Sequence, residues 1–191
     1  MRLRPVALDD PAARCLVFRC WSEICQRYGI PAPCGEAEAL PTGSFAPPDG
    51  TFLVGEVEGV AVACGGVRRC DDAPPGVGEI KRMFVEPAYR GRGLGRVLLA
   101  ALEAEARRLG YRGLWLETGT AQPEALQLYE TAGWTPMPRY GEYKGEEDSR
   151  CYQKVQTAEG GACLSGPSQG CSEEATERRS ACEQTTPGRA G

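Results

Sequence analysis

The sequence predicts one α/β (α+β) domain with a mixed central sheet and flanking helices, followed by a tail. Apolar β-forming runs first make a meander, and strand and helix patterns then alternate along the chain. The length of 191 residues and the 41% hydrophobic content suit one ordinary domain. Apolar periodicity stops after Val155, so we expect residues 1–155 to form the domain and residues 156–191 to form a disordered C-terminal tail.

The first elements are predicted by alternation and by capping residues. Residues 2–7 alternate weakly, which favours a strand. Asp10 and Pro11 are typical of a helix start, because Asp caps free N–H groups and Pro suits the first helical position. Apolar residues at spacings of three and four continue to Tyr28, and Gly29 ends this helix.

A loop and a three-stranded meander come next. Residues 31–50 are rich in Pro and Gly and indicate a loop, with a short helix at 35–40. Residues 51–57 and 60–67 are predicted strands separated by a two-residue turn. Residues 77–85 form the third predicted strand of the meander.

The remaining elements alternate. We expect a helix at 91–109, a strand at 113–118, a helix at 123–132, a strand beginning at Trp134 and a last strand at 149–155. The expected buried face of the first of these helices is Leu94, Val97, Leu98, Ala101, Leu102, Ala106 and Leu109. The side chains expected to face water are Arg96, Glu103, Arg107 and Arg108.

The composition excludes several functional classes. The net charge of -4 argues against a nucleic-acid partner, and no apolar run is long enough to span a membrane. The absence of histidine removes Ser-His-Asp triads, Cys-His pairs and histidine-containing zinc sites. The 10 cysteines contain no Cys-x-x-Cys pair, so we expect most of them to be small core hydrophobes or incidental surface thiols rather than metal ligands. Without a signal-like apolar stretch near residue 1, we expect a cytoplasmic protein.

The strongest motif is Arg90-Gly91-Arg92-Gly93-Leu94-Gly95, between a predicted strand and a predicted helix. Glycines allow a ligand close to the backbone, and a helix N-terminus offers N–H groups to an anion. A dinucleotide fingerprint fails because its third glycine position is Arg96, and Gly-Lys-Ser/Thr is absent. The pattern Arg/Gln-x-x-Gly-x-Gly/Ala, which holds the pyrophosphate of coenzyme A, fits completely.

A second motif carries the same resemblance. It runs from Gln122 through Ala125, Leu128 and Tyr129 to Gly133-Trp134. Together with the segment from Glu79 to Gly95, it resembles the GNAT superfamily of acetyl-CoA-dependent N-acetyltransferases over roughly residues 2–155. The departures from the family pattern are Gln122 in place of Asn and Trp134 in place of Phe.

The resemblance implies the GNAT fold, with a mixed sheet splayed around the coenzyme. It implies coenzyme contacts from the backbone of the central strand, from the glycine-rich loop and from the second motif. These cofactor-binding candidates are Met83, Phe84, Val85, Arg90, Gly91, Arg92, Gly93, Leu94, Gly95 and Gln122. The backbone N–H of Met83 is expected to polarise the thioester carbonyl, and no metal is implied.

The resemblance also implies two catalytic residues. Glu79 is the candidate base for the incoming amine, and a structural or substrate-binding carboxylate is an equally weighted interpretation of this residue. Glu117 is the second choice of base, and deprotonation through ordered water is the third alternative. Tyr129 is the candidate acid that protonates the leaving thiolate. The side chains expected on the acceptor side are Arg68, Arg69, Lys81, Arg82, Arg139, Tyr140, Glu142 and Tyr143.

The expected reaction is direct transfer of acetyl from acetyl-CoA to a primary amine in a ternary complex. A small molecule or amino acid is the expected acceptor. A protein or peptide acceptor and a non-catalytic acyl-CoA-sensing module are the alternatives, and both a monomer and a homodimer remain open.

Overall fold

The computed structural model describes residues 1–31 and 45–156. The expected helix at 35–40 and the tail beyond Gln156 lie outside the described residues. The elements follow the chain as β1 (Arg2–Val6), α1 (Pro11–Tyr28), β2 (Thr51–Val57), β3 (Val60–Arg69), β4 (Val77–Val85), the 3₁₀ turn η2 (Pro87–Tyr89), α2 (Leu94–Arg108), β5 (Gly113–Gly119), α3 (Pro123–Thr131), β6 (Thr135–Met137) and β7 (Ser149–Val155).

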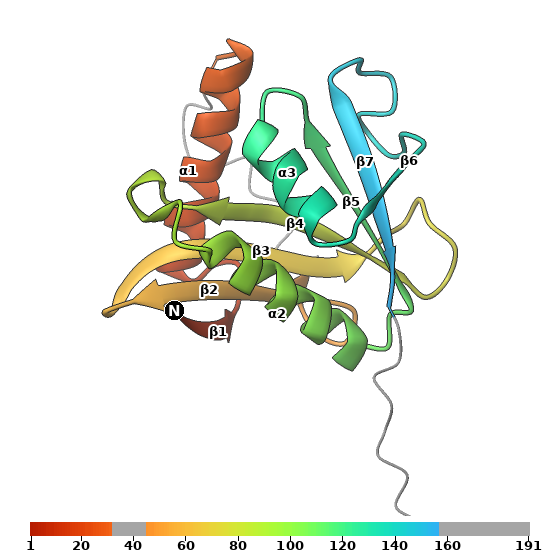
Figure 1. The fold of residues 1–191 in the computed structure, drawn as a ribbon. Helices are drawn as coiled ribbons and strands as arrows, with labels where there is room; N and C mark the ends of the chain where they lie inside the picture. Colours follow the sequence, from red (N-terminus) through yellow and green to blue (C-terminus); the bar gives the residue numbers. More distant parts are fainter. Residues whose placement is uncertain (32–44, 157–191) are drawn as a thin grey trace, which may run out of the picture. The chain divides into compact units, whose positions relative to one another are not determined.

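The strands form one mixed sheet in the order β1-β2-β3-β4-β5-β7-β6 (Figure 1). Only β4 and β5 pair in parallel, while the other neighbouring strands pair antiparallel. The predicted mixed sheet is therefore confirmed. Its parallel pair joins the meander to the strand–helix half of the chain, through α2 as the crossover.

The sheet opens where this parallel ladder ends. Residues 77–80 of β4 pair with residues 113–116 of β5, and the last pair is Ile80 with Leu116. Both strands continue beyond it, β4 to Val85 and β5 to Gly119. The far half of β4 therefore has β3 on one side and no ladder with β5 on the other.

A bulge in β4 lies next to this opening. Cys64 of β3 pairs with Phe84, but Gly66 pairs with Lys81, so β4 contains one extra residue. Arg82 has a φ of 58°, in the left-handed region that L-residues rarely adopt. The extra residue moves later side chains to the opposite face. Ile80 accordingly packs in one hydrophobic cluster and Phe84 in the other.

Two cores cover the two faces of the sheet. The larger joins the sheet to α2 and α3, and its fully buried aliphatic side chains include Leu98, Leu102 and Leu116. The smaller joins the other face to α1 through Leu16 and Phe52. Each helix thus buries one stripe, as the 3.6-residue period predicts.

The ends of the helices follow from a few residues. The Asp10 carboxylate caps α1 by accepting hydrogen bonds from the N–H groups of Ala12 (2.9 Å) and Ala13 (3.3 Å). The expected start of α2 at Gly91 is wrong, because Gly91 and Gly93 both have φ of 75°. A left-handed residue interrupts a right-handed helix, so α2 begins at Leu94 and the glycines form a loop.

Two expectations for α2 are also wrong. Val97 is 47% exposed, whereas Glu103 is 9% exposed. The Glu103 carboxylate accepts hydrogen bonds from the indole Nε1–H of Trp134 (2.9 Å) and from Lys154 Nζ (2.8 Å). Helical periodicity shows only which residues share a face. The hydrogen bonds from Trp134 and Lys154, which lie far from Glu103 in the sequence, offset the cost of burying its carboxylate.

We expect Lys154→Met to lower the free energy of unfolding by about 2 kcal/mol, because it leaves the buried Glu103 carboxylate without its cation. Arg108→Ala removes the exposed pair with Glu105 and should cost under about 0.5 kcal/mol. Urea unfolding of both variants measures the difference. Equal losses would show that the buried pair contributes no more than the exposed one.

Candidate functional site

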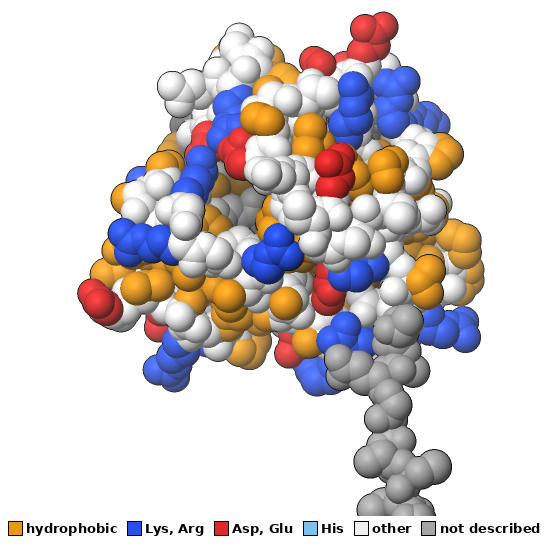
Figure 2. All heavy atoms as spheres, in the orientation of Figure 1, with side chains coloured by type: hydrophobic (Ala, Val, Ile, Leu, Met, Phe, Trp, Pro, Cys, Tyr) orange, Lys and Arg blue, Asp and Glu red, His pale blue; other side chains and the backbone are white. Residues whose placement is uncertain are grey.

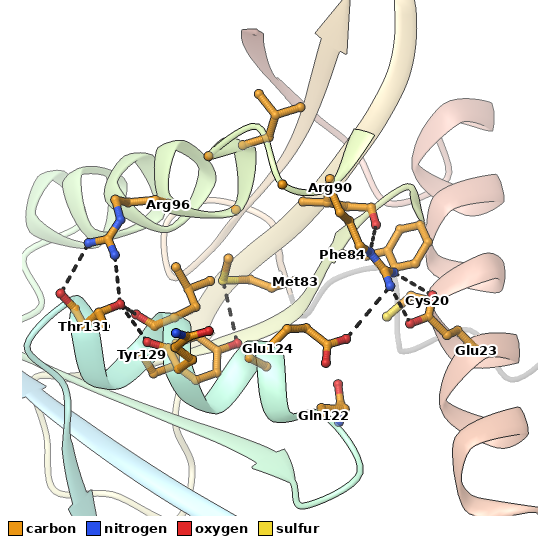
Figure 3. A pocket seen from close by; sticks show the side chains of 18 of the residues that line it. Cys20, Glu23, Met83, Phe84, Arg90, Arg96, Gln122, Glu124, Tyr129 and Thr131 are labelled. Carbon is orange, nitrogen blue, oxygen red and sulfur yellow. Dashed lines mark hydrogen bonds and ion pairs between the residues drawn. The ribbon is translucent and has the colours of Figure 1, made fainter. Parts of the chain in front are cut away.

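A cavity of about 460 Å³ lies at the opening beside β4. Figure 2 shows the hollow in the orientation of Figure 1, with acidic and basic side chains close together at its rim. Four segments line it: one face of α1, the end of β4, the glycine-rich loop with the first turn of α2, and α3 (Figure 3).

The structure gathers most of the predicted cofactor-binding residues around this cavity. Nine of the ten line it: Met83, Phe84, Val85, Arg90, Gly91, Gly93, Leu94, Gly95 and Gln122. Arg92 does not; its guanidinium lies 5.1 Å from the ring centre of Tyr89 and donates to the carbonyl of Ala88. Tyr129 lines the cavity and Glu79 does not.

The loop at 90–95 forms a cradle of backbone N–H groups. Within the described chain, the N–H groups of residues 91–95 donate to no backbone carbonyl, whereas those of Arg96 and Val97 donate to Gly93. A Cβ built on Gly91 or Gly93 would have no atom within 4 Å, so both glycines border open space. Free N–H groups at the positive end of α2 suit a bound anion such as a pyrophosphate.

Arg90 holds the cradle in place rather than presenting a free cation. Its Nε–H donates to the carbonyl of Val85 (2.8 Å), and its two Nη groups reach the carboxylate of Glu23 at 3.0 and 2.6 Å. Glu23 also accepts from Arg27, which pairs with Glu124 of α3. Burial alone would raise the pKa of Glu23, but the hydrogen bonds from Arg90 and Arg27 outweigh it and lower the pKa.

This network ties α1, the glycine-rich loop and α3 together around one side of the cavity (Figure 3). Sequence reasoning missed Glu23, which lies 67 positions before Arg90. The one sequence feature that pointed to Glu23 was its spacing of four residues from Arg27, and this spacing is typical of any solvent-exposed ion pair on a helix.

Tyr129 places a protonated hydroxyl at the β4 side of the cavity. The side chain is 6% exposed, and its hydroxyl lies 3.9 Å from the sulfur of Met83. Burial raises the pKa of Tyr129 well above its usual value, with the acidic groups Cys20 and Glu117 adding to the rise. The hydroxyl therefore stays protonated at neutral pH and is available as a donor.

Glu79 is enclosed by its own partners. Its side chain is buried, and one carboxylate oxygen accepts from Arg68 at 3.0 Å. The other oxygen lies 3.4 Å from Lys81 Nζ and accepts from the hydroxyl of Tyr140 at 3.0 Å. The Tyr140 ring packs against Trp115 with ring centres 4.9 Å apart. These contacts hold the expected acceptor-side loop against the sheet.

Glu117 is the first residue of β5 beyond the last pair with β4. Its carboxylate accepts one hydrogen bond, from the buried hydroxyl of Ser149 on β7 at 3.2 Å. Burial raises the pKa of Glu117, while the positive charges of Lys81 and Arg82 act against that rise. Glu117 is therefore a carboxylate with free acceptor capacity beside the opening of the sheet.

The described residues that line the cavity provide neither a thiolate nor a cluster of metal ligands. Cys20 lines it, but burial raises the pKa of this thiol to about 11, so it is protonated at neutral pH. No group of three or more acidic, thiol or imidazole side chains in residues 1–31 and 45–156 is arranged to hold a metal ion. In the same residues, none of the helices has the length and apolar character needed to cross a membrane.

Comparison with known proteins agrees with this geometry. The sequence profile of the Acetyltransferase (GNAT) family matches residues 15–134. The IAA acetyltransferase of Azospirillum brasilense is 40% identical over 111 residues, which are 58% of this chain and 71% of that protein.

Solved structures share the fold. A crystal structure from Klebsiella pneumoniae, named as an acyl-CoA N-acyltransferase, has a TM-score of 0.65 and 28% identity, covering 82% of this chain and 97% of that one. The yncA structure from Salmonella typhimurium contains acetyl-CoA. It has a TM-score of 0.58 and 22% identity, covering 85% of this chain and 99% of the other.

Proposed function

The chain belongs to the acetyltransferase (GNAT) family, and from that premise we propose that it transfers acetyl from acetyl-CoA directly to the primary amine of a small molecule. One observation carries the proposal. A single cavity joins an anion cradle at the start of α2 to the hydroxyl of Tyr129, along the edge of β4 that has no ladder with β5. The cradle suits a pyrophosphate, and the hydroxyl suits a leaving thiolate.

The residues present fit acetyl-CoA. The cradle at 91–95 would hold the pyrophosphate, and Met83–Val85 offer backbone groups along a strand edge to an extended amide-containing arm. Arg90, fixed by Glu23 and by the carbonyl of Val85, would set the distance between the cradle and β4.

The reaction needs a base and an acid at different points. The neutral amine attacks the thioester carbon, a C–N bond forms, and the C–S bond breaks as the tetrahedral intermediate collapses. The backbone N–H of Met83, which lies in the β4 bulge, would stabilise the oxyanion. Tyr129 would donate its proton to the departing sulfur, and the amine's proton would go to a carboxylate or a water beside it.

For that carboxylate we propose Glu117, with Glu79 as the alternative. Both oxygens of Glu79 are already in contact with Arg68, Lys81 or Tyr140, which leaves the carboxylate little capacity to accept a further proton donor. Glu117 makes one hydrogen bond, and burial moves its pKa upward, which makes it a stronger base than an ordinary solvent-exposed glutamate.

A panel of amines, amino acids, peptides and antibiotics tests the function. Free-thiol release from acetyl-CoA, measured for each compound, should identify a small primary amine that is acetylated. Turnover restricted to peptides or proteins would contradict the small-molecule acceptor. Binding of acetyl-CoA without turnover of any amine would favour a non-catalytic acyl-CoA sensor instead.

Gly93→Val should weaken acetyl-CoA binding at least tenfold, about 1.4 kcal/mol. Valine at a φ of 75° is strained, and its side chain projects into the open space of the cradle. Isothermal titration calorimetry of the folded variant measures the effect.

Gly110→Val is the matched control, because Gly110 also has a positive φ (87°) and open space around its Cβ, but it does not line the cavity. We expect this variant to lose stability while keeping its affinity for acetyl-CoA. An unchanged affinity in Gly93→Val would contradict the assignment of the cradle.

A further inference from the structure

We propose that the amine acceptor carries a carboxylate close to its amino group, and that the guanidinium of Arg82 binds this carboxylate. The substrate class would then be α-amino acids and close analogues. The inference rests on the proposed function and adds the interaction that would select the acceptor, a contact between Arg82 and a carboxylate.

The backbone fixes Arg82 in an unusual position. It lies in the β4 bulge together with Met83, between the paired residues Lys81 and Phe84, and its φ of 58° is strained for a non-glycine residue. Its carbonyl accepts a hydrogen bond from the buried thiol of Cys64, with sulfur and oxygen 3.5 Å apart. Its guanidinium carbon lies 5.0 Å from the ring centre of Trp21 on α1, which is cation–π distance. The side chain is therefore held on the α1 side of the sheet.

The charge of Arg82 has no carboxylate partner among residues 1–31 and 45–156. None of its guanidinium nitrogens makes a hydrogen bond or ion pair with them, and Nε is buried without a partner. The neighbouring cations differ, since Arg68 and Lys81 both contact Glu79. A partly buried guanidinium without an acceptor is costly, and a bound carboxylate would satisfy it with paired N–H···O bonds.

The position of Arg82 suits an acceptor rather than the coenzyme. Arg82 does not line the cavity that contains the pyrophosphate cradle. It precedes Met83, where we place the thioester carbonyl, and its positive charge acts on both Glu117 and Tyr143. An α-amino acid has its amine and carboxylate on one carbon, so a carboxylate on Arg82 would present the amine beside Glu117 and the thioester.

A matched pair of acceptors tests the inference: an α-amino acid found in the panel and its primary carboxamide. The two differ in the negative charge. We expect kcat/KM of the wild-type protein to favour the acid by about thirtyfold, the value of one charge-assisted contact. Arg82→Gln should remove this preference by lowering kcat/KM for the acid about thirtyfold and for the amide under threefold, with unchanged acetyl-CoA affinity.

Two further variants separate charge from structure. Arg82→Lys keeps the positive charge and should retain part of the preference, whereas Arg108→Gln, an exposed arginine at the end of α2, should leave it unchanged. An equal loss for acid and amide in Arg82→Gln would overturn the inference, as would equal use of both by the wild type. The comparison of acid and amide in the wild-type protein tests the inference even if Arg82→Gln does not fold.

The two proposals fail differently. Turnover only of amines that lack a carboxylate would overturn the role of Arg82 and leave the acetyltransferase proposal intact. Absence of turnover with every amine would overturn the proposed reaction itself.

Discussion

Tyr129→Phe is expected to lower kcat by about 10²- to 10⁴-fold while changing acetyl-CoA affinity less than threefold. The substitution removes one oxygen from a buried ring whose packing against Trp134 and Tyr152 is otherwise kept. The hydroxyl makes only a long contact with the sulfur of Met83, so little binding energy or stability depends on it. The proton for the departing thiolate does depend on it, because burial keeps the hydroxyl protonated.

Tyr152→Phe is the matched control for this prediction. Tyr152 belongs to the same core, with its ring centre 6.0 Å from that of Tyr129, but its hydroxyl donates to Glu130 and it does not line the cavity. We expect its kcat to change less than threefold. Full kcat in Tyr129→Phe, measured with the best acceptor of the panel, would show that coenzyme A leaves unaided or through water.

Local rules predicted most of the fold. Asp10 and Gly29 marked both ends of α1, and the strands from Thr51 to Val85 followed from β-forming residues and turns. The motif at 90–95 was identified as a candidate anion cradle because it lies within six adjacent residues, but the helix was expected to begin at Gly91 rather than at Leu94. These features depend on short-range geometry, which the sequence specifies directly.

The unpredicted features depend on pairing between distant segments. The bulge at Arg82 is defined by the pairing of β4 with β3, in which Gly66 pairs with Lys81 and Cys64 pairs with Phe84. No residue pattern within β4 predicts it. The contact of Glu23 with Arg90 is likewise a consequence of where α1 packs. Such contacts decide whether a given charge is free or already neutralised.

Glu117→Gln is expected to lower kcat/KM at pH 7 by about 10²- to 10³-fold and to remove one acidic limb of the pH–rate profile. Only the ionised carboxylate accepts a proton, so activity falls as pH drops through its pKa. Burial raises that pKa, so the limb should lie above the range of an ordinary glutamate. The amine of the acceptor produces a second limb. Two acceptors whose amines differ in pKa separate the two limbs, because only the amine's limb moves between them.

Glu79→Gln is the isosteric comparison on the neighbouring strand. The amide can still accept from Tyr140, but Arg68 and Lys81 lose their counter-charge, so we expect a lower melting temperature and a retained enzyme limb. If instead Glu79→Gln removes the limb and Glu117→Gln keeps it, the base is Glu79. If both variants keep it, the proton leaves through water. In Glu79→Gln, the hydrogen bond from Ser149 to Glu117 is retained. The geometry around Glu117 is then unchanged and only the charge of Glu79 is lost, so a change in the limb of this variant reports on Glu79 alone.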